Sequence, residues 1–346
     1  MTDSPTTPTV ASIGERALID RIRERAGPPP AHVVIGIGHD AAALQPDRGA
    51  LTVLTTDSLI EDVHFRRAWV SPDAIGHKAL AVNLSDLAAM GALPRAALLS
   101  LALPPAFPLS DFDELVSGFL ALANTARLPL IGGNITSSPG PLVVDATVVG
   151  SGHPRKLLTR GGAQPGDELY VTGHVGGAAA GLAWLTAGRD LEEATDEIRG
   201  AVERYARPMP RWRCGIIAAR TRAASAAIDL SDGLAEAARQ LAEASGFGVE
   251  LDAASIPVDA GMRFWADDRG LDAREAAVAG GEDYELLFAV APRRRSRFLA
   301  AMRRCRDVAV TQVGIVTRPR EATWRRDGTV APLPRGFRHL QEAPPQ

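Results

Sequence analysis

The positions of the aspartates limit the possible folds of this chain more than any other feature of its sequence. Asp57 directly follows a strand-like, largely apolar run at 51–56, and Asp86 interrupts an otherwise apolar stretch of helix length. The aspartates that follow or interrupt apolar segments in this way are Asp40, Asp57, Asp86, Asp229 and Asp232. Burying a carboxylate is unfavourable unless it is paired or bound to a cation. The fold must therefore compensate several acidic groups from separate segments.

Strand-like and helix-like segments alternate through both halves of the chain. In the first half, a short apolar run occupies 33–37, and we expect strands at 51–56, 98–103, 128–132 and 142–149 and helices at 75–90 and 112–125. In the second half we expect strands at 168–172, 226–229, 249–251, 288–290 and 308–316 and helices at 176–185 and 234–244. This mixed order predicts an α+β or α/β structure for each half.

A length of 346 residues predicts two domains. We expect an N-terminal domain at 13–152 and a C-terminal domain at 153–341, with 155–166 as the connector. The first residues are rich in Thr and Pro, and we expect disordered tails at 1–12 and 342–346.

The composition limits which binding partners and which cellular compartment we expect for this chain. The net charge of −3 gives no support for a nucleic-acid partner. No apolar run reaches the roughly 18 residues that span a bilayer, and the N-terminus lacks the order of a secretory signal. Cys214 and Cys305 form no CxxC pattern, so neither a zinc site nor a disulfide framework is indicated. These features favour a cytoplasmic protein that does not bind membranes.

A shared cation is the simplest compensation for the aspartates, because Lys78 and Lys156 are the only lysines, although arginines are plentiful. Oxygen ligands favour Mg²⁺ or Mn²⁺ over zinc, and such a site suits phosphoryl transfer. Each aspartate also has a purely structural interpretation when taken alone. Asp232 could cap the following helix, and Asp40 and Asp57 could be turn residues. Asp86 resists the structural interpretation most, because an aspartate in the middle of a helix has poor helix propensity and no capping use.

Glycine-rich turns form a second feature, because glycine lets the backbone approach a phosphate closely. They occur at 36–38, 132–133 and 280–281, beside polar residues, although most glycine pairs are ordinary turns. The P-loop pattern and the protein-kinase signature are both absent. The glycines at 173–177 lack the full dinucleotide-binding pattern, and we interpret them as tight strand–helix packing.

Three polar features remain open between functional and structural interpretations. His64 follows the strand that ends at Asp57 and could face the same cleft, or it could be an ordinary loop histidine. Arg160 could clamp a phosphate or could simply be solvated. The acids at 282–285 lie between a glycine pair and an apolar strand, where they could belong to a site or to a solvated loop.

Five segments, taken in order, resemble those of the thiamine-monophosphate kinases. They are 36–42, 55–59, 78–92, 228–234 and 280–286. The sequence Asn-Leu-Ser-Asp at 83–86 and the sequence Gly-Gly-Glu-Asp-Tyr-Glu-Leu at 280–286 are the specific ones. The resemblance covers nearly the whole chain outside the tails.

The resemblance implies the two-domain fold shared with aminoimidazole ribonucleotide synthetase, with a mixed sheet flanked by helices in the N-terminal domain and an α/β C-terminal domain. It implies a homodimer built on the N-terminal domains and transfer of the ATP γ-phosphoryl group to thiamine monophosphate. The implied Mg²⁺ ligands are Asp40, Thr55, Thr56, Asp57, Asp86, Asn134, Asp229 and Asp232. The implied ATP contacts are Gly133, Asn134, Arg160 and Ser231, and the implied substrate contacts are His64, Glu282 and Phe337.

Three positions depart from the family pattern. His39 replaces the first of two acids, Asn134 replaces a common Asp, and Ala237 stands where many members have an acid. Asn134 still offers an oxygen ligand but carries no negative charge. Two alternatives therefore stay open: another ATP-dependent synthetase on the same scaffold, or a relative that binds nucleotide or thiamine without turnover.

Overall fold

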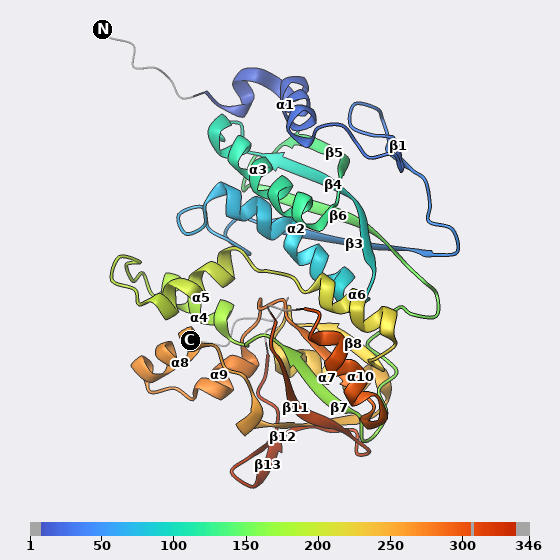
Figure 1. Cartoon of the computed structure of the whole chain (residues 1–346). Coiled ribbons are helices and arrows are strands. Elements are labelled where there is room, and N and C mark those ends of the chain that lie inside the picture. The colour runs from blue at the N-terminus through green and yellow to red at the C-terminus, as the bar shows by residue number, and fades with distance from the viewer. Residues whose placement is uncertain (1–7, 306–307, 337–346) are drawn as a thin grey trace. The chain divides into compact units, whose positions relative to one another are not determined.

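Residues 8–305 and 308–336 are described by a computed structural model of the chain (Figure 1). The chain divides into two compact units. The N-terminal unit comprises Met1–Leu87 and Leu93–Pro154, and the C-terminal unit comprises Ala88–Ala92 and Arg155–Gln346. The short segment around residue 90 belongs to the C-terminal unit, where Met90 O accepts a hydrogen bond of 3.0 Å from Leu158 N.

The N-terminal unit is built on a four-stranded mixed sheet in the order β3-β6-β4-β5. Its strands are β3 (Leu51–Ile60), β4 (Leu93–Leu103), β5 (Leu130–Ser137) and β6 (Val143–Gly152). The β3–β6 and β4–β6 pairs are antiparallel, and the β4–β5 pair is parallel. The other elements are α1 (Val10–Ala26), the short pair β1 (Val33–Ile35) and β2 (Ala43–Leu44), α2 (Pro72–Ala89) and α3 (Leu109–Ala126).

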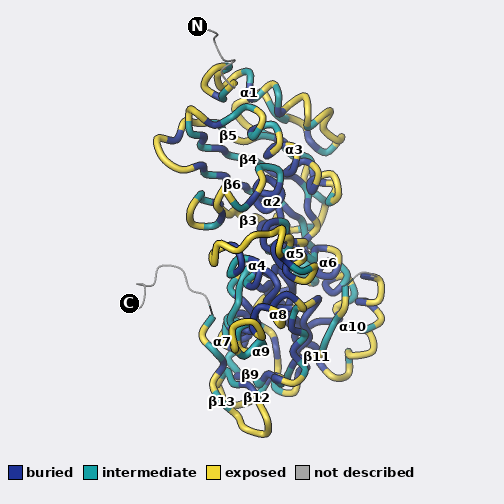
Figure 2. The backbone as a smooth tube through the Cα atoms, turned by 90° about the vertical axis from the view of Figure 1, so that its left-hand side faces the viewer, coloured by how far each residue is buried: buried dark blue, intermediate teal, exposed yellow. Residues whose placement is uncertain are grey.

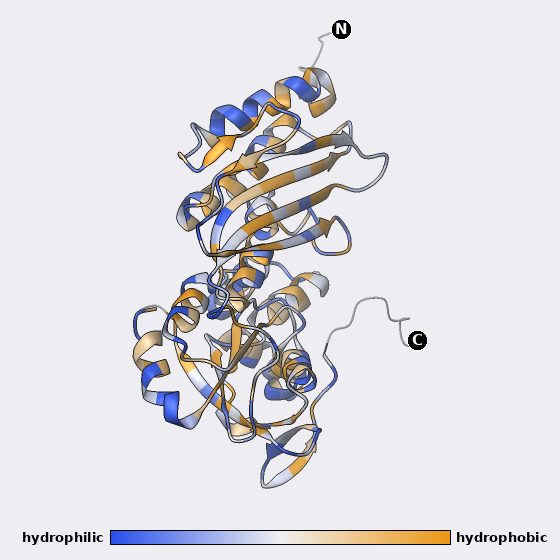
Figure 3. Ribbon diagram, turned by 90° about the vertical axis from the view of Figure 1, so that its right-hand side faces the viewer, coloured by the Kyte–Doolittle hydropathy of each residue, from blue (hydrophilic) through white to orange (hydrophobic). Residues whose placement is uncertain are grey.

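The two faces of this sheet differ because successive side chains of a strand point to opposite sides. On β4 and β6 the buried residues alternate with half-buried ones, and Leu99, Leu101, Val144 and Val148 are among the buried set. Helices α2 and α3 lie across one face of the sheet (Figure 1). We call this the helix face and the other the outer face. Hydrophobic residues predominate along the strands of the sheet (Figure 3).

The expected N-terminal tail was too long. Helix α1 begins at Val10, whose side chain is only 5% exposed and whose backbone N–H donates to Phe107 O at 2.9 Å. Residues 10–12 are therefore helical, because an apolar side chain at the helix start packs into the N-terminal unit. The expected tail at 342–346 lies outside the described residues.

The C-terminal unit contains a seven-stranded mixed sheet in the order β13-β12-β9-β11-β7-β10-β8. Its strands are β7 (Glu168–Thr172), β8 (Ala226–Asp229), β9 (Gly248–Asp252), β10 (Leu286–Val290), β11 (Val310–Thr317), β12 (Ala322–Arg326) and β13 (Thr329–Pro332). Its α-helices are α4 (Gly177–Thr186), α5 (Asp196–Ala206), α6 (Trp212–Thr221), α7 (Leu234–Ser245), α8 (Ala260–Arg269), α9 (Ala273–Ala279) and α10 (Arg295–Met302).

Every residue of β7, β8 and β10 is buried, so these strands form part of the core of the C-terminal unit, although β8 lies at an edge of the sheet. Exposed residues concentrate in loops and on helix surfaces (Figure 2). The predicted mixed sheet flanked by helices is confirmed for the N-terminal half, and the predicted combination of strands and helices is confirmed for the C-terminal half. Both cysteines are buried and free of disulfide bonds. No helix in the described part of the chain is long and apolar enough to cross a membrane.

Candidate functional site

Strand β3 and helix α2 bring together three of the predicted metal ligands on the helix face. The Thr55 hydroxyl donates a hydrogen bond to Asp86 Oδ2. Asp57 lies two residues further along β3 and therefore points to the same side as Thr55. Asp86 is half-buried and Asp57 is exposed. The N-terminal unit thus presents a cluster of hard oxygen atoms at this end of the sheet.

Thr56 points to the opposite, outer face. Its hydroxyl contacts Thr147 Oγ1 at 3.0 Å, Ala146 O at 3.2 Å and Asp145 Oδ1 at 3.4 Å. The side chain of Thr56 is therefore separated from the Thr55–Asp86 pair by the sheet itself. The resemblance grouped the two threonines as ligands, but the alternation of a strand places their side chains on different faces.

A cavity of about 1190 Å³ lies in the N-terminal unit against the outer face. It is lined by residues of α1, by the segment 36–42 and by parts of β4, β5 and β6. The predicted residues Asp40, Gly133 and Asn134 all line it. Asp40 and Asn134 are exposed, so both have side chains that a ligand can reach. The predicted set in this unit is thus divided between the cavity and the helix face.

The donor chemistry of the N-terminal unit fits Mg²⁺. In the part of the chain that the structure describes, no three His, Cys, Asp or Glu side chains cluster closely enough to hold a metal ion. Mg²⁺ does not need such a cluster, because it commonly binds through one or two carboxylates, with phosphate oxygens and water completing its shell. One turn before Asp86, the buried Asn83 Oδ1 accepts no hydrogen bond from the described residues. This oxygen is a further potential acceptor for a cation or its water.

His64 is held in one orientation in the loop between β3 and α2. Its Nδ1 accepts a hydrogen bond of 3.0 Å from Ile60 N, and its carbonyl oxygen lies 3.5 Å from Lys78 Nζ. A neutral imidazole whose Nδ1 is an acceptor carries its proton on Nε2. His64 therefore offers an Nε2–H donor when it is neutral. Lys78, whose ammonium group lies near the His64 carbonyl, is buried and only 1% exposed.

In the C-terminal unit, the end of β8 meets the loop at 280–285. Asp229 is the last residue of β8 and is 5% exposed. Directly after it, Ser231 O accepts a hydrogen bond of 2.7 Å from Glu282 N. Two residues predicted from distant motifs, one for ATP and one for the substrate, are therefore neighbours in space. Asp232 follows Ser231 and is half-buried.

The backbone of this loop is strained. Glu282 and Tyr284 have φ angles of 67° and 50°, in the left-handed region that non-glycine residues seldom adopt. Such a conformation costs about 1–3 kcal/mol per residue and persists only where the surroundings enforce it. Gly281 packs so closely that a Cβ atom there would lie 2.6 Å from Ser231 O. The loop therefore holds Glu282 in one tightly constrained place.

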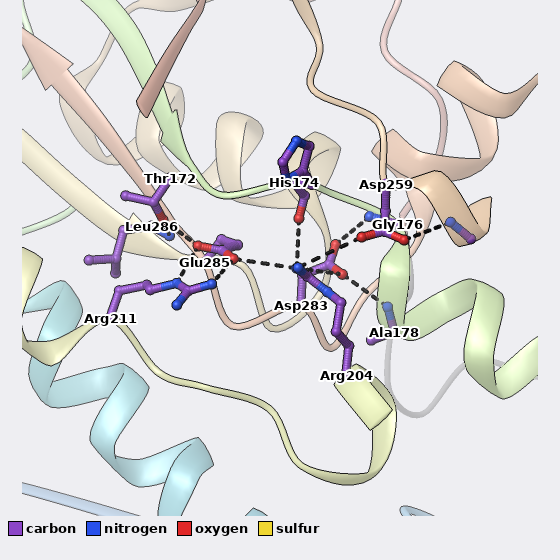
Figure 4. A network of polar contacts seen from close by, with 11 residues as sticks. Thr172, His174, Gly176, Ala178, Arg204, Arg211, Asp259, Asp283, Glu285 and Leu286 are labelled. Atoms are coloured by element: carbon purple, nitrogen blue, oxygen red, sulfur yellow. Dashed lines mark hydrogen bonds and ion pairs between the residues drawn. The ribbon is translucent and has the colours of Figure 1, made fainter. Parts of the chain in front are cut away.

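Two buried acids anchor the loop, and the sequence left their role open. Asp283 accepts hydrogen bonds from Gly176 N at 2.6 Å and Ala178 N at 3.1 Å, at the start of α4 (Figure 4). Burial raises the pKa of Asp283 to about 7, although Arg204 and the two N–H groups oppose this shift. Glu285 is fully buried and is bound by Arg211. These acids are structural anchors inside the unit and do not form a solvated loop.

Arg160 and Phe337 are the remaining predicted ligand contacts. Arg160 is exposed, and its guanidinium donates to Gln240 Oε1 on α7 at 2.7 Å. Phe337 lies outside the described residues.

Two family models match most of the chain. Residues 38–151 match the N-terminal domain of AIR synthase related proteins, and residues 164–325 match their C-terminal domain. A thiamine-monophosphate kinase of Salmonella typhimurium is 39% identical over 305 residues, which are 87% of this chain and 88% of that protein. One from Bacillus subtilis is 37% identical over 254 residues, or 73% of this chain and 77% of that protein.

Solved structures of related proteins are also similar to this chain over most of its length. A thiamine-monophosphate kinase from Stenotrophomonas maltophilia has a TM-score of 0.79 and 38% identity, covering 91% of this chain and 97% of its own. The structure of AaThiL complexed with AMPPCP and TMP has a TM-score of 0.75 and 30% identity, covering 97% of this chain and 100% of its own. The hydrogenase maturation protein HypE in complex with ATP, at 18% identity and a TM-score of 0.77, shares the fold.

Proposed function

The chain belongs to the AIR synthase-related family and, within it, to the thiamine-monophosphate kinases, and we propose that it phosphorylates thiamine monophosphate to thiamine diphosphate with ATP. This is the last step in making thiamine diphosphate. The observation that carries the proposal is the match of both units to a structure that holds AMPPCP and TMP. The ATP analogue and the monophosphate in that structure correspond to the two substrates of a kinase with a phosphate acceptor.

The reaction we propose is direct in-line transfer of the γ-phosphoryl group to a phosphate oxygen of thiamine monophosphate. That oxygen is already ionised near neutral pH, so the chain needs no strong general base. Catalysis then depends on orientation of the two substrates and on charge stabilisation. The strained loop that carries Glu282 and the fixed orientation of His64 support such a role, because both are preorganised. We propose that these two residues, with Phe337, contact the thiamine substrate.

For ATP, we propose contacts from the backbone at Gly133, from Asn134, from the Arg160 guanidinium and from Ser231. Gly133 and Asn134 line the cavity of the N-terminal unit, where a glycine backbone lets a phosphate approach. The Arg160 guanidinium is exposed and offers donors that suit phosphate oxygens.

We propose that the reaction depends on Mg²⁺ and that the chain binds several ions. The proposed ligands are Asp40, Thr55, Thr56, Asp57, Asp86 and Asn134 in the N-terminal unit and Asp229 and Asp232 in the C-terminal unit. The hard oxygen atoms around Thr55 and Asp86 support this proposal for the N-terminal unit. When bound, Mg²⁺ would neutralise phosphate charge and reduce the repulsion between the two anionic substrates.

We also propose a homodimer formed through the N-terminal units and a cytoplasmic location. Strand β3 is an edge strand of its sheet, and its side chains Leu51 and Leu54 are 49% and 67% exposed. A long edge with exposed apolar residues is a natural surface for another chain. Sedimentation of the full chain tests the dimer, and a monomer at micromolar concentration would contradict it. Fractionation of cells that produce the chain tests its location, and recovery with the membranes would contradict the cytoplasmic proposal.

The direct test of the function is a coupled assay of ADP formation with and without thiamine monophosphate, repeated with EDTA. We expect ADP and thiamine diphosphate in equal amounts, only when the acceptor is present and only without EDTA. Release of inorganic phosphate with another acceptor would favour a synthetase. Binding of the substrates without ADP formation would favour a relative that has lost turnover.

A further inference from the structure

The loop at 280–285 joins α9 to β10 and has an outward and an inward part. Glu282 is half-buried, whereas Asp283, Tyr284 and Glu285 are buried. The backbone N–H groups of Glu282 and Tyr284 bond to Ser231 O and Leu230 O, which attaches this part of the loop to the end of β8. These backbone bonds hold the Glu282 end of the loop against the segment that follows β8.

Asp283 holds the loop from the other side. Its two carboxylate oxygens accept from Gly176 N at 2.6 Å and Ala178 N at 3.1 Å. Gly176 is the N-cap residue of α4 and Ala178 lies in its first turn, where the helix dipole also favours a negative charge. Asp283 thereby links the loop at residue 282 to the N-terminal end of a helix that is distant in sequence.

Glu285 and two arginines complete this anchor (Figure 4). Arg211 binds both oxygens of Glu285, at 2.7 and 2.5 Å, and Thr172 Oγ1 donates to Glu285 at 2.6 Å. Arg204 Nη2 lies 3.3 Å from Glu285 Oε1 and 3.8 Å from Asp283 Oδ1, and donates to His174 O at 2.7 Å. Arg204 therefore connects both buried acids to the segment that follows β7.

We propose that Asp283 is a positioning residue that acts through Glu282. With its bonds to α4 it keeps Glu282 in its left-handed conformation beside Ser231. The proposal rests on the proposed function, because Glu282 is there assigned to the thiamine substrate. None of Asp283, Glu285 and the two arginines is among the proposed substrate contacts. Its effect on the reaction is to keep the Glu282 carboxylate from exploring other positions.

The test is Asp283→Asn, because the amide keeps the size of the side chain but replaces one of the two accepting oxygens with an NH2 group, which cannot accept from an N–H group. We expect faster hydrogen exchange at the amides of Glu282 and Tyr284 in the absence of any substrate. We also expect the KM for thiamine monophosphate to rise about tenfold, while kcat and the KM for ATP stay within about twofold.

Asp252→Asn is the matched control. Asp252 also accepts a hydrogen bond from a helical N–H, that of Ala254 at 3.1 Å, but within the described residues it forms no hydrogen bond or ion pair with the loop at 280–285. In this control, both the hydrogen exchange of the loop and the kinetics should equal those of the native chain. Arg204→Lys provides a second variant in case Asp283→Asn does not fold, and we expect a smaller change in the same direction.

A double variant separates positioning from general destabilisation. In a Glu282→Gln background, Asp283→Asn should raise the KM for thiamine monophosphate no further, because the group that it positions has already been replaced. Unchanged exchange in the Asp283→Asn variant, or an equal and independent effect in both backgrounds, would overturn the proposal. Lack of kinase activity in the native chain would instead refute the proposed function, and the exchange measurement would still decide whether Asp283 orders the loop.

Discussion

The hydroxyl of Thr55 donates to the carboxylate of Asp86, which joins strand β3 to helix α2 at the helix face of the N-terminal sheet. We predict that Asp86→Asn lowers kcat at least about 100-fold, because it removes the negative charge that a divalent cation needs. The amide oxygen can still accept from Thr55, so the fold should persist. Initial rates over a range of Mg²⁺ concentrations measure the effect.

Asp47→Asn is the control for that experiment. Asp47 also accepts from a hydroxyl on a neighbouring strand, that of Ser151 at 2.6 Å, but it is not among the proposed ligands. Its rate and its Mg²⁺ dependence should match those of the native chain. Equal losses in the two variants would show that the Asp86 effect is structural.

Asn134→Asp should increase the apparent affinity for Mg²⁺. Asn134 lines the same cavity as Asp40 and is exposed, so an added negative charge would reach a bound cation or its water. We expect the Mg²⁺ concentration for half-maximal rate to fall several-fold, because an opposite charge within a few ångströms strengthens cation binding. Titration of the initial rate with Mg²⁺ measures it. Activity that appears only in the variant would indicate that the native chain has lost turnover.

The pH dependence of stability should report on Asp283. Its pKa is about 7 in the folded chain because of burial, compared with an ordinary value of 3.8. The folded chain thus holds this proton more tightly than the unfolded chain. The contribution of Asp283 protonation to the free energy of unfolding is therefore fully present below about pH 4 and is lost as the pH rises to about 7. This contribution is about 4 kcal/mol at most. Asp283→Asn cannot titrate and should lose this component.

Urea unfolding of the native chain and of Asp283→Asn between pH 5 and 8 measures that component. We expect the variant to be less stable than the native chain by the largest margin at pH 5 and by a smaller margin at pH 8. Asp252→Asn should follow the native pH profile. A constant difference between Asp283→Asn and the native chain across this range would contradict the assignment.

Part of the fold could be predicted because its signals are local. Strands β7 and β8 each contain an uninterrupted apolar run, at 169–171 and 226–228, and the sequence located both strands with correct bounds. Helix α5 was missed although Ile198, Val202 and Tyr205 follow helical spacing, so its signal was available. Strand β12 carries little local signal, because only Trp324 is buried and its pairing with β9 is remote in sequence.

In the candidate site, too, the contacts between segments distant in sequence could not be predicted. The motifs identified Ser231 and Glu282 separately, but their contact depends on the pairing of β8 with β10, which no local pattern encodes. The sequence also did not predict that Asp283 is a buried anchor. Its partners are backbone N–H groups at the start of α4, and the identity of the residues does not show which backbone groups will bond to a distant side chain. By contrast, the separation of Thr55 from Thr56 could have been derived from strand alternation alone.

A methyl group added at Gly281 should lower the free energy of unfolding, whereas the same group added at Gly200 should raise it. A Cβ at Gly281 would lie 2.6 Å from Ser231 O, and both backbone segments are held by hydrogen bonds, so neither can move without breaking them. We predict that Gly281→Ala costs about 1–3 kcal/mol of unfolding free energy and raises the KM for thiamine monophosphate. Gly200 lies in α5, and a Cβ there would meet no described atom within 4 Å apart from its chain neighbours and the backbone of its own helix. Gly200→Ala should therefore add up to about 1 kcal/mol of unfolding free energy.

Urea unfolding of both variants measures these free energies, and assays at varied thiamine monophosphate measure the KM. Because the two variants add the same atoms, their difference isolates the contact between the Gly281 segment and Ser231. If Gly281→Ala were as stable as the native chain and kept its KM, the loop would have room to move. The close contact could then not be what holds Glu282 beside Ser231.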